Sequence, residues 1–164
     1  MALQTSRFIE TLTSAGPTAD RVAKLALYGQ FIGDWTFEAT VNKDDGTQHR
    51  GHGEIHFAWV LDGRAIQDVW ILPGMFYGST LRVYDPGIDA WHIHWSDPLK
   101  QLYTQQIGRA EGDDIVQLGE AGGVHIRWRF TDIKTDSFRW RSERSADGGG
   151  TWPLQADFRA RRAG

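Results

Sequence analysis

From residue 33 onward, hydrophobic side chains alternate with polar ones at a period of two, and short runs rich in glycine, proline and aspartate interrupt the alternation. Side chains along a β-strand point alternately to its two faces, so this pattern predicts strands separated by tight turns. No helical pattern lies between any two of them. We predict ten strands, over residues 33–41, 50–60, 64–72, 79–85, 90–96, 101–108, 114–119, 124–131, 136–143 and 154–162.

The residues before the first strand follow a different pattern. Apolar residues recur at helical spacing over residues 19–30, and Thr18 stands where it would cap such a helix. A shorter helix is expected around residues 6–12. We therefore predict that residues 1–32 form a helical segment capping one end of a β-barrel domain that comprises residues 33–164.

The connections between the predicted strands are short, and this constrains how the strands pair. A parallel pair needs a crossover of a dozen or more residues, so consecutive strands should be antiparallel. Ten strands in a meander would leave two exposed edges unless the sheet closes on itself. We predict an all-β fold, a ten-stranded antiparallel up-and-down barrel with an N-terminal helix. A two-sheet sandwich is the alternative.

Alternation also assigns side chains to the two faces of the sheet, and most of the 8 tryptophans fall in the hydrophobic set that should point inward. A ten-stranded barrel is wider than the eight-stranded barrel that side chains just fill, so we expect a cavity walled by aromatic rings. The alternative is that these rings pack the barrel shut. The predicted ligand-binding residues are Trp35, Phe57, Trp59, Trp70, Trp91, Trp95, Trp128 and Trp140, with the polar Gln105 and Ser142 on the same face.

The strand expected over residues 79–85 is ambiguous, because Leu81 and Val83 share one face while Arg82 and Tyr84 share the other. If the second face points inward, Arg82 and Tyr84 are also ligand-binding residues. The sequence leaves this open.

Asp68 is the best candidate for chemistry, because alternation places its carboxyl group inside the barrel, beside Ile66 and Trp70. A carboxyl group in apolar surroundings is held less easily in its charged form, which suits a general acid or base. Tyr103, which has inward parity as well, is the second catalytic candidate. Two alternatives give Asp68 a structural role, either at the barrel rim or in a pair with Arg82.

Composition narrows the class of protein. The chain has 164 residues, 40% hydrophobic and 24% charged, as expected for one globular domain, and it contains no cysteine for disulfides or thiolate metal sites. No apolar run approaches the ~18 residues of a membrane span. The net charge of −3, with a basic run confined to residues 159–162, argues against a nucleic-acid partner.

The N-terminal sequence lacks the features of a secretory signal, so we expect a cytoplasmic protein with no membrane partner. Whether two barrels pair as a homodimer is left open by the sequence.

Histidine spacings would allow a metal site. His92 and His94 share one face of a strand, His52 and His56 share a face of another, and His125 begins a later strand. Three histidines can hold zinc, but alternation places both pairs on the outer, solvated face. No histidine has clear inward parity for a haem, and glycine-rich phosphate loops and a nucleophile elbow are absent. We expect neither a metal nor a cofactor.

Three segments resemble a bacterial calycin-type family of unknown function: GDW at 33–35, LDGRAIQDVW at 61–70 and LRVYDPGIDAWHIHWSD at 81–97. The similarity spans residues 30–162. Calycin barrels such as lipocalins, fatty-acid-binding proteins and nitrobindins mostly bind hydrophobic small molecules, and a minority of lipocalin-like barrels are cofactor-free lyases, hydratases or cyclases. The resemblance implies a calycin barrel and assigns no catalytic residue. Its matching positions are Gly33 and Trp35, Gly63-Arg64 with Gln67 and Trp70, and Tyr84-Asp85.

Together these features favour a protein that binds a hydrophobic, aromatic or polyene-like small molecule in a barrel cavity. The first alternative is a cofactor-free isomerase, cyclase or lyase that uses the same cavity, with Asp68 as acid or base and Tyr103 or Tyr84 orienting a substrate oxygen. The second is a dimeric scaffold without a ligand, which a filled interior would favour.

Overall fold

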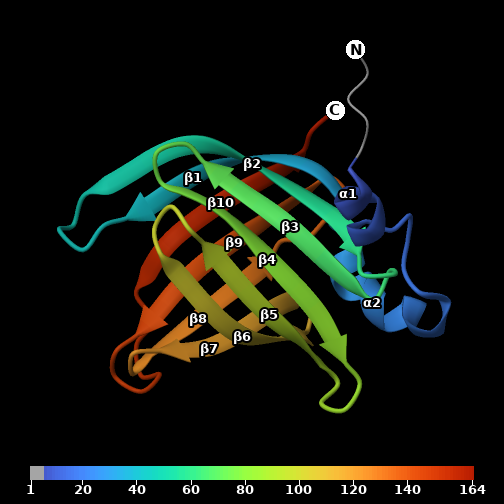
Figure 1. Cartoon of the computed structure of the whole chain (residues 1–164). Coiled ribbons are helices and arrows are strands. Elements are labelled where there is room, and N and C mark those ends of the chain that lie inside the picture. Colours follow the sequence, from blue (N-terminus) through green and yellow to red (C-terminus); the bar gives the residue numbers. More distant parts are fainter. Residues whose placement is uncertain (1–5) are drawn as a thin grey trace.

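A computed structural model describes residues 6–164, which form a closed barrel of ten antiparallel strands with short helices before it (Figure 1). The predicted up-and-down barrel is confirmed, and the sandwich is excluded because β1 pairs with both β2 and β10. The strands are β1 Gly33–Asn42, β2 Gln48–Val60, β3 Ala65–Leu72, β4 Phe76–Asp85, β5 Ala90–Asp97, β6 Leu102–Glu111, β7 Asp114–Ala121, β8 Val124–Thr131, β9 Ser137–Ser145 and β10 Leu154–Arg162.

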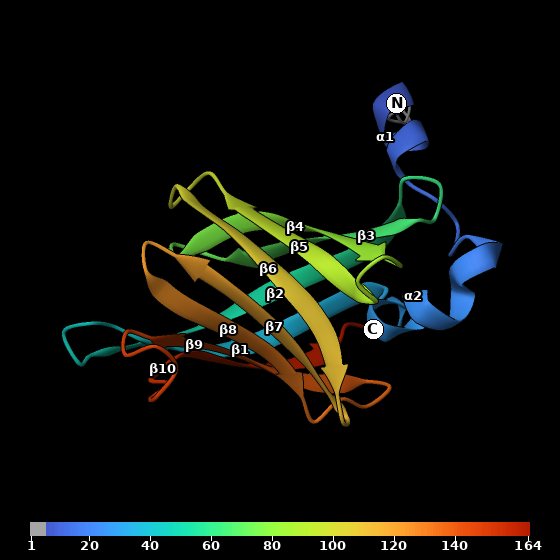
Figure 2. The ribbon, with the colours of Figure 1, turned by 90° about the horizontal axis from the view of Figure 1, so that it is seen from below.

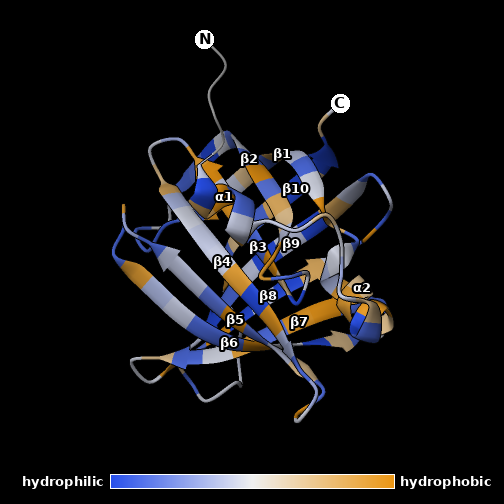
Figure 3. Ribbon diagram, turned by 45° about the vertical axis from the view of Figure 1, so that its right-hand side comes forward, coloured by the Kyte–Doolittle hydropathy of each residue, from blue (hydrophilic) through white to orange (hydrophobic). Residues whose placement is uncertain are grey.

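The register of the strands follows the alternation in the sequence, and Figure 3 shows hydrophobic and hydrophilic residues alternating along the ribbons. The seam between the first and last strands runs from Trp35 opposite Arg162 to Val41 opposite Ala156. Because the seam is fully paired, the barrel has no free sheet edge.

Three short helical elements precede the barrel: α1 Arg7–Leu12, a 3₁₀ turn over Ala19–Arg21, and α2 Val22–Gly29. The helix expected over residues 19–30 therefore begins as a 3₁₀ turn. Thr18 does not cap it through its side chain, since its hydroxyl donates to the Asp20 carboxylate at 2.7 Å instead.

The end of α2 and the turn after it close one end of the barrel (Figure 2). Tyr28 and Phe31 are buried there, and the Phe31 ring centre lies 4.9 Å from those of Phe130 and Phe138. The Trp35 indole nitrogen donates to the Phe31 carbonyl at 2.7 Å. Aromatic side chains thus fill this end of the interior.

The other end of the barrel carries only loops: those joining β1 to β2, β3 to β4, β5 to β6, β7 to β8 and β9 to β10 (Figures 1 and 2). No helix of the described residues covers this end. Among residues 6–164, no helix is long and apolar enough to cross a membrane.

The facing of β6 is the reverse of the predicted one. Tyr103 is 57% exposed and Gln105 also lies on the outer face, while Gln106 and Gly108 point inward. The reason is a contact from outside the strand: the Tyr28 hydroxyl occupies the space inside Gly108, where an added Cβ would lie 2.4 Å from it. The residues of β6 that point inward beside Tyr28, Gln106 and Gly108, are therefore a polar residue and a glycine.

The ambiguity in β4 is resolved by its burial pattern. Arg82 and Tyr84 point inward and are 1% and 7% exposed, and Thr80 lies on the same face. Leu81 and Val83 face outward.

Candidate functional site

A cavity of about 260 Å³ lies inside the barrel at its open end. Its wall combines aromatic rings with a few polar side chains, and its mouth is formed by the loops at this end. The lining residues are Val41, Asn42, Trp70, Met75, Phe76, Thr80, Arg82, Trp95, Asp97, Lys100, Leu102, Trp128, Trp140, Ser142, Gln155, Ala156 and Phe158.

Four tryptophans shape the wall of this cavity. The ring centres of Trp128 and Trp140 are 5.4 Å apart, those of Trp70 and Trp140 are 5.4 Å apart, and Trp95 lies 6.2 Å from Trp128. Gly78 leaves room for Trp95, because a Cβ at that position would lie 2.4 Å from the indole ring. The rings are thus held by their neighbours and present a preformed apolar surface.

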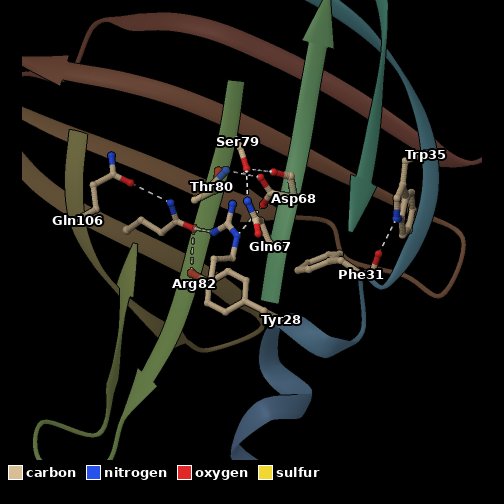
Figure 4. A network of polar contacts seen from close by, with 10 residues as sticks. Tyr28, Phe31, Trp35, Gln67, Asp68, Ser79, Thr80, Arg82 and Gln106 are labelled. Atoms are coloured by element: carbon tan, nitrogen blue, oxygen red, sulfur yellow. Dashed lines mark hydrogen bonds and ion pairs between the residues drawn. The ribbon is translucent and has the colours of Figure 1, made fainter. Parts of the chain in front are cut away.

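The floor of the cavity is polar, with Arg82 at the centre of a hydrogen-bonded network. Its Nε donates to Asp68 Oδ2 at 2.8 Å, and its Nη1 donates to Gln117 Oε1 at 2.5 Å. Asp68 Oδ1 accepts the backbone N–H of Thr80 at 3.0 Å. Figure 4 shows Arg82 between Asp68 and Tyr28. The two charges are almost inaccessible, with 1% of the Arg82 side chain and 0% of the Asp68 side chain exposed.

The same network links the barrel to α2. The Tyr28 hydroxyl donates to Gln117 Oε1 at 2.8 Å, and Gln117 Nε2 donates to Gln106 Oε1 at 2.8 Å. Burial raises the pKa of Tyr28 well above its usual value, so the phenol stays protonated and serves as a donor. The network separates the filled end of the interior from the cavity.

Asp97 is a polar residue of the cavity wall that is not among the predicted site residues. It ends β5, is 1% exposed, and its Oδ1 accepts the backbone N–H groups of Leu99 and Lys100 at 3.0 and 3.2 Å. In the sequence, the Asp97-Pro98 pair predicts only a boundary between strands. Asp97 lies on the same face of its strand as Ile93 and Trp95, because alternate residues share a face. This spacing is the sequence signal that predicts an inward carboxylate.

The predicted ligand-binding residues divide into three groups. Six of them line the cavity, as expected: Trp70, Arg82, Trp95, Trp128, Trp140 and Ser142.

A second group points inward but packs away from the cavity. Trp35, Phe57 and Trp91 are buried nearer the closed end, and Trp59 packs beside Gly29. Tyr84 also lies towards the closed end, where its hydroxyl donates to Asp89 at 2.5 Å.

The third group lies on the outside of the barrel. Tyr103 and Gln105 do not reach the cavity, and the Tyr103 hydroxyl donates to Gln101 at 2.8 Å. The inward placement predicted for both residues is wrong, because the face of β6 expected to point into the barrel points to solvent.

Asp68 is inside the barrel, but it does not line the cavity. Both carboxylate oxygens are occupied, one by Arg82 and the other by the Thr80 backbone, which is the structural pairing raised as an alternative. An acid–base role for Asp68 stays a prediction, and the geometry offers it no open path to a ligand.

The histidine motifs lie on the outer face. His92 is half-buried and its Nε2 contacts Asp85 Oδ2 at 2.8 Å, while His56 contacts both Asp34 and Glu54. Within residues 6–164 no group of three histidine, aspartate or glutamate side chains is placed to hold a metal.

A larger hollow of about 630 Å³ lies on the outer surface over β1, β2 and β10, between side chains such as Glu38, His52 and Arg159. These side chains belong to the solvated face of the barrel. The smaller interior cavity, enclosed by aromatic rings, is the better candidate for a ligand site.

The fold and the cavity together define a calycin-like barrel with an aromatic interior site open at one end. No known family model and no curated protein sequence matches the chain. Several solved structures are similar in fold, including the following two. One is an S-type phycobiliprotein lyase, CPES from Guillardia theta, with a TM-score of 0.59 and 11% identity over 90% of this chain and 99% of that one. The other is Rv2717c from M. tuberculosis, with a TM-score of 0.59 and 14% identity over 87% and 98%.

Proposed function

We propose that the protein binds a hydrophobic, aromatic small molecule in the cavity at the open end of the barrel. The observation that carries this proposal is the unfilled space between Trp70, Trp95, Trp128 and Trp140. At the closed end, aromatic rings pack against one another. Concave sites lined by aromatic side chains with a few polar groups are typical of small-molecule binding.

The size of the cavity limits the ligand. Its volume of about 260 Å³ lies just below the roughly 300–1,000 Å³ of pockets for drug-sized molecules. It equals the liquid volume of roughly nine water molecules at ~30 Å³ each. A ligand of one or two fused rings matches this space, and a longer polyene would have to project through the mouth.

The floor of the cavity supports binding rather than catalysis. The charged group on the floor, Arg82, is engaged with Asp68 behind it. The similarity to a phycobiliprotein lyase concerns the fold, so the binding proposal rests on the cavity itself.

Fluorescence of N-phenyl-1-naphthylamine, whose emission rises in apolar surroundings, tests the proposal. We expect the protein to bind this probe, and Ser142→Phe to weaken binding by at least about tenfold because the new ring fills the cavity. Gln105→Phe is the matched control, since it adds the same ring to the outer face. Equal binding by the wild type and Ser142→Phe would contradict the proposal.

Native mass spectrometry of the protein as purified gives a second measurement. A discrete extra mass that Ser142→Phe loses and Gln105→Phe retains would identify a ligand carried in the cavity.

A further inference from the structure

We propose that the ligand carries a positively charged amine, and that Asp97 binds this group while the tryptophan wall binds the rings. This inference rests on the proposed function and specifies the chemistry of the ligand at the same site. Asp97 is the acidic residue that lines the cavity.

Asp97 is a buried carboxylate without a compensating cation. It is 1% exposed, and within residues 6–164 no lysine, arginine or histidine nitrogen lies within 4.0 Å of it. Its Oδ1 accepts two backbone N–H groups, and no donor of the described residues reaches Oδ2. Carboxylates are almost never fully buried unless they are paired. A ligand ammonium would supply the missing partner.

The two cations on the cavity wall do not fill this role. Arg82 is neutralised by Asp68 at 2.8 Å and donates its Nη1 hydrogen to Gln117. Lys100 is an exposed residue at the mouth, and its ammonium lies beyond 4.0 Å from every carboxylate of the described residues. Its side chain can turn to solvent when a ligand enters.

The aromatic wall favours the same charge. The faces of indole rings carry partial negative charge and attract ammonium groups, and tryptophan does so most strongly among the aromatic residues. Trp95 stands two residues before Asp97 on the same face of β5, and Trp128 lies beside it. The acid and the rings therefore converge on one end of the cavity. A carboxylic acid ligand would meet repulsion from Asp97 in the same space.

Three probes that share one ring system separate the alternatives: 2-naphthylmethylamine, which is protonated near neutral pH, 2-methylnaphthalene, and 2-naphthoate. Equilibrium dialysis with chromatographic detection measures each dissociation constant. We expect the amine to bind at least about tenfold more tightly than 2-methylnaphthalene, and 2-naphthoate to bind most weakly.

Asp97→Asn removes the charge and keeps an oxygen for the two backbone N–H groups. In this variant the amine should bind within about threefold of 2-methylnaphthalene, whose own affinity should not change. Asp44→Asn is the control, because Asp44 is an acid at the same mouth with 90% of its side chain exposed. It should retain the preference for the amine.

The outcomes separate this inference from the proposed function. If none of the probes binds the wild type, both fail. If 2-methylnaphthalene binds and the amine binds no more tightly, or if 2-naphthoate binds best, the cavity stands and the role of Asp97 is refuted. Retention of the amine preference by Asp97→Asn refutes it as well. Should that variant fail to fold, the ranking of the three probes on the wild type decides the question.

Discussion

Replacing Asp68 by asparagine should destabilise the protein strongly, because it leaves the Arg82 guanidinium buried without a counter-charge. The two side chains are 0% and 1% exposed and contact each other at 2.8 Å. Removing one partner of such a pair typically costs about 3–5 kcal/mol. The amide oxygen of the introduced side chain can still accept the Thr80 backbone N–H, but its NH2 group replaces the oxygen that accepts from Arg82 Nε. The loss therefore combines the charge with that hydrogen bond.

Urea unfolding followed by tryptophan fluorescence is the assay. With a slope of about 2 kcal/mol per molar for a domain of this size, the transition midpoint should fall by roughly 1.5–2.5 M. The matched control is Asp157→Asn, because Asp157 pairs with Arg139 where 17% and 28% of the side chains are exposed. Solvent partly screens that pair, so its loss should cost less than the loss of the fully buried pair.

A double-variant cycle identifies the cause of the destabilisation. Arg82→Met in the Asp68→Asn background removes the uncompensated charge, so the double variant should be less destabilised than the sum of the two single variants. If Asp68→Asn costs no more than Asp157→Asn, or if the two substitutions are additive, the explanation through a buried, unpaired charge is wrong.

Two further predictions concern other parts of the barrel. Gly108→Ala should cost about 1–3 kcal/mol, because its Cβ would lie 2.4 Å from the Tyr28 hydroxyl, while Gly16→Ala meets nothing within 4 Å and should leave the urea midpoint unchanged. A hydrogen bond to Asp34 raises the pKa of His56 above 6.5 in the folded protein. His56 therefore contributes stability that is fully present below pH ~6 and is lost as pH rises through its folded pKa, so the stability difference between wild type and His56→Gln should shrink on that rise. An NMR titration midpoint of His56 at or below 6.5 would contradict this.

Most of the fold follows from local signals in the sequence. Each predicted strand corresponds to an observed one, with ends shifted by up to three residues, because period-two alternation and short turns are properties of neighbouring residues. Antiparallel pairing followed from the short connections, and closure followed from the two edges that an open sheet would expose. Neither inference required knowledge of distant contacts.

The errors arise where a distant element determines the local structure. In β6 Tyr103 and Ile107 lie on the outer face because Tyr28 from α2 enters beside Gly108 and because Gln106 bonds with Gln117. The alternation of residues within the strand does not show these contacts with α2 and β7. The reversal removed Tyr103 and Gln105 from the interior.

Position along the barrel axis is the other quantity that alternation does not give. Trp91 and Trp95 share one face of β5 and are about 13 Å apart along the strand at ~3.3 Å per residue. Trp91 packs 4.8 Å from the Tyr28 ring at the closed end, whereas Trp95 lines the cavity. Two equivalent residues in the sequence pattern thus have different roles because α2 fills one end of the barrel only. The ligand site is therefore determined jointly by the strands, which set the facing, and by the helix, which sets the depth.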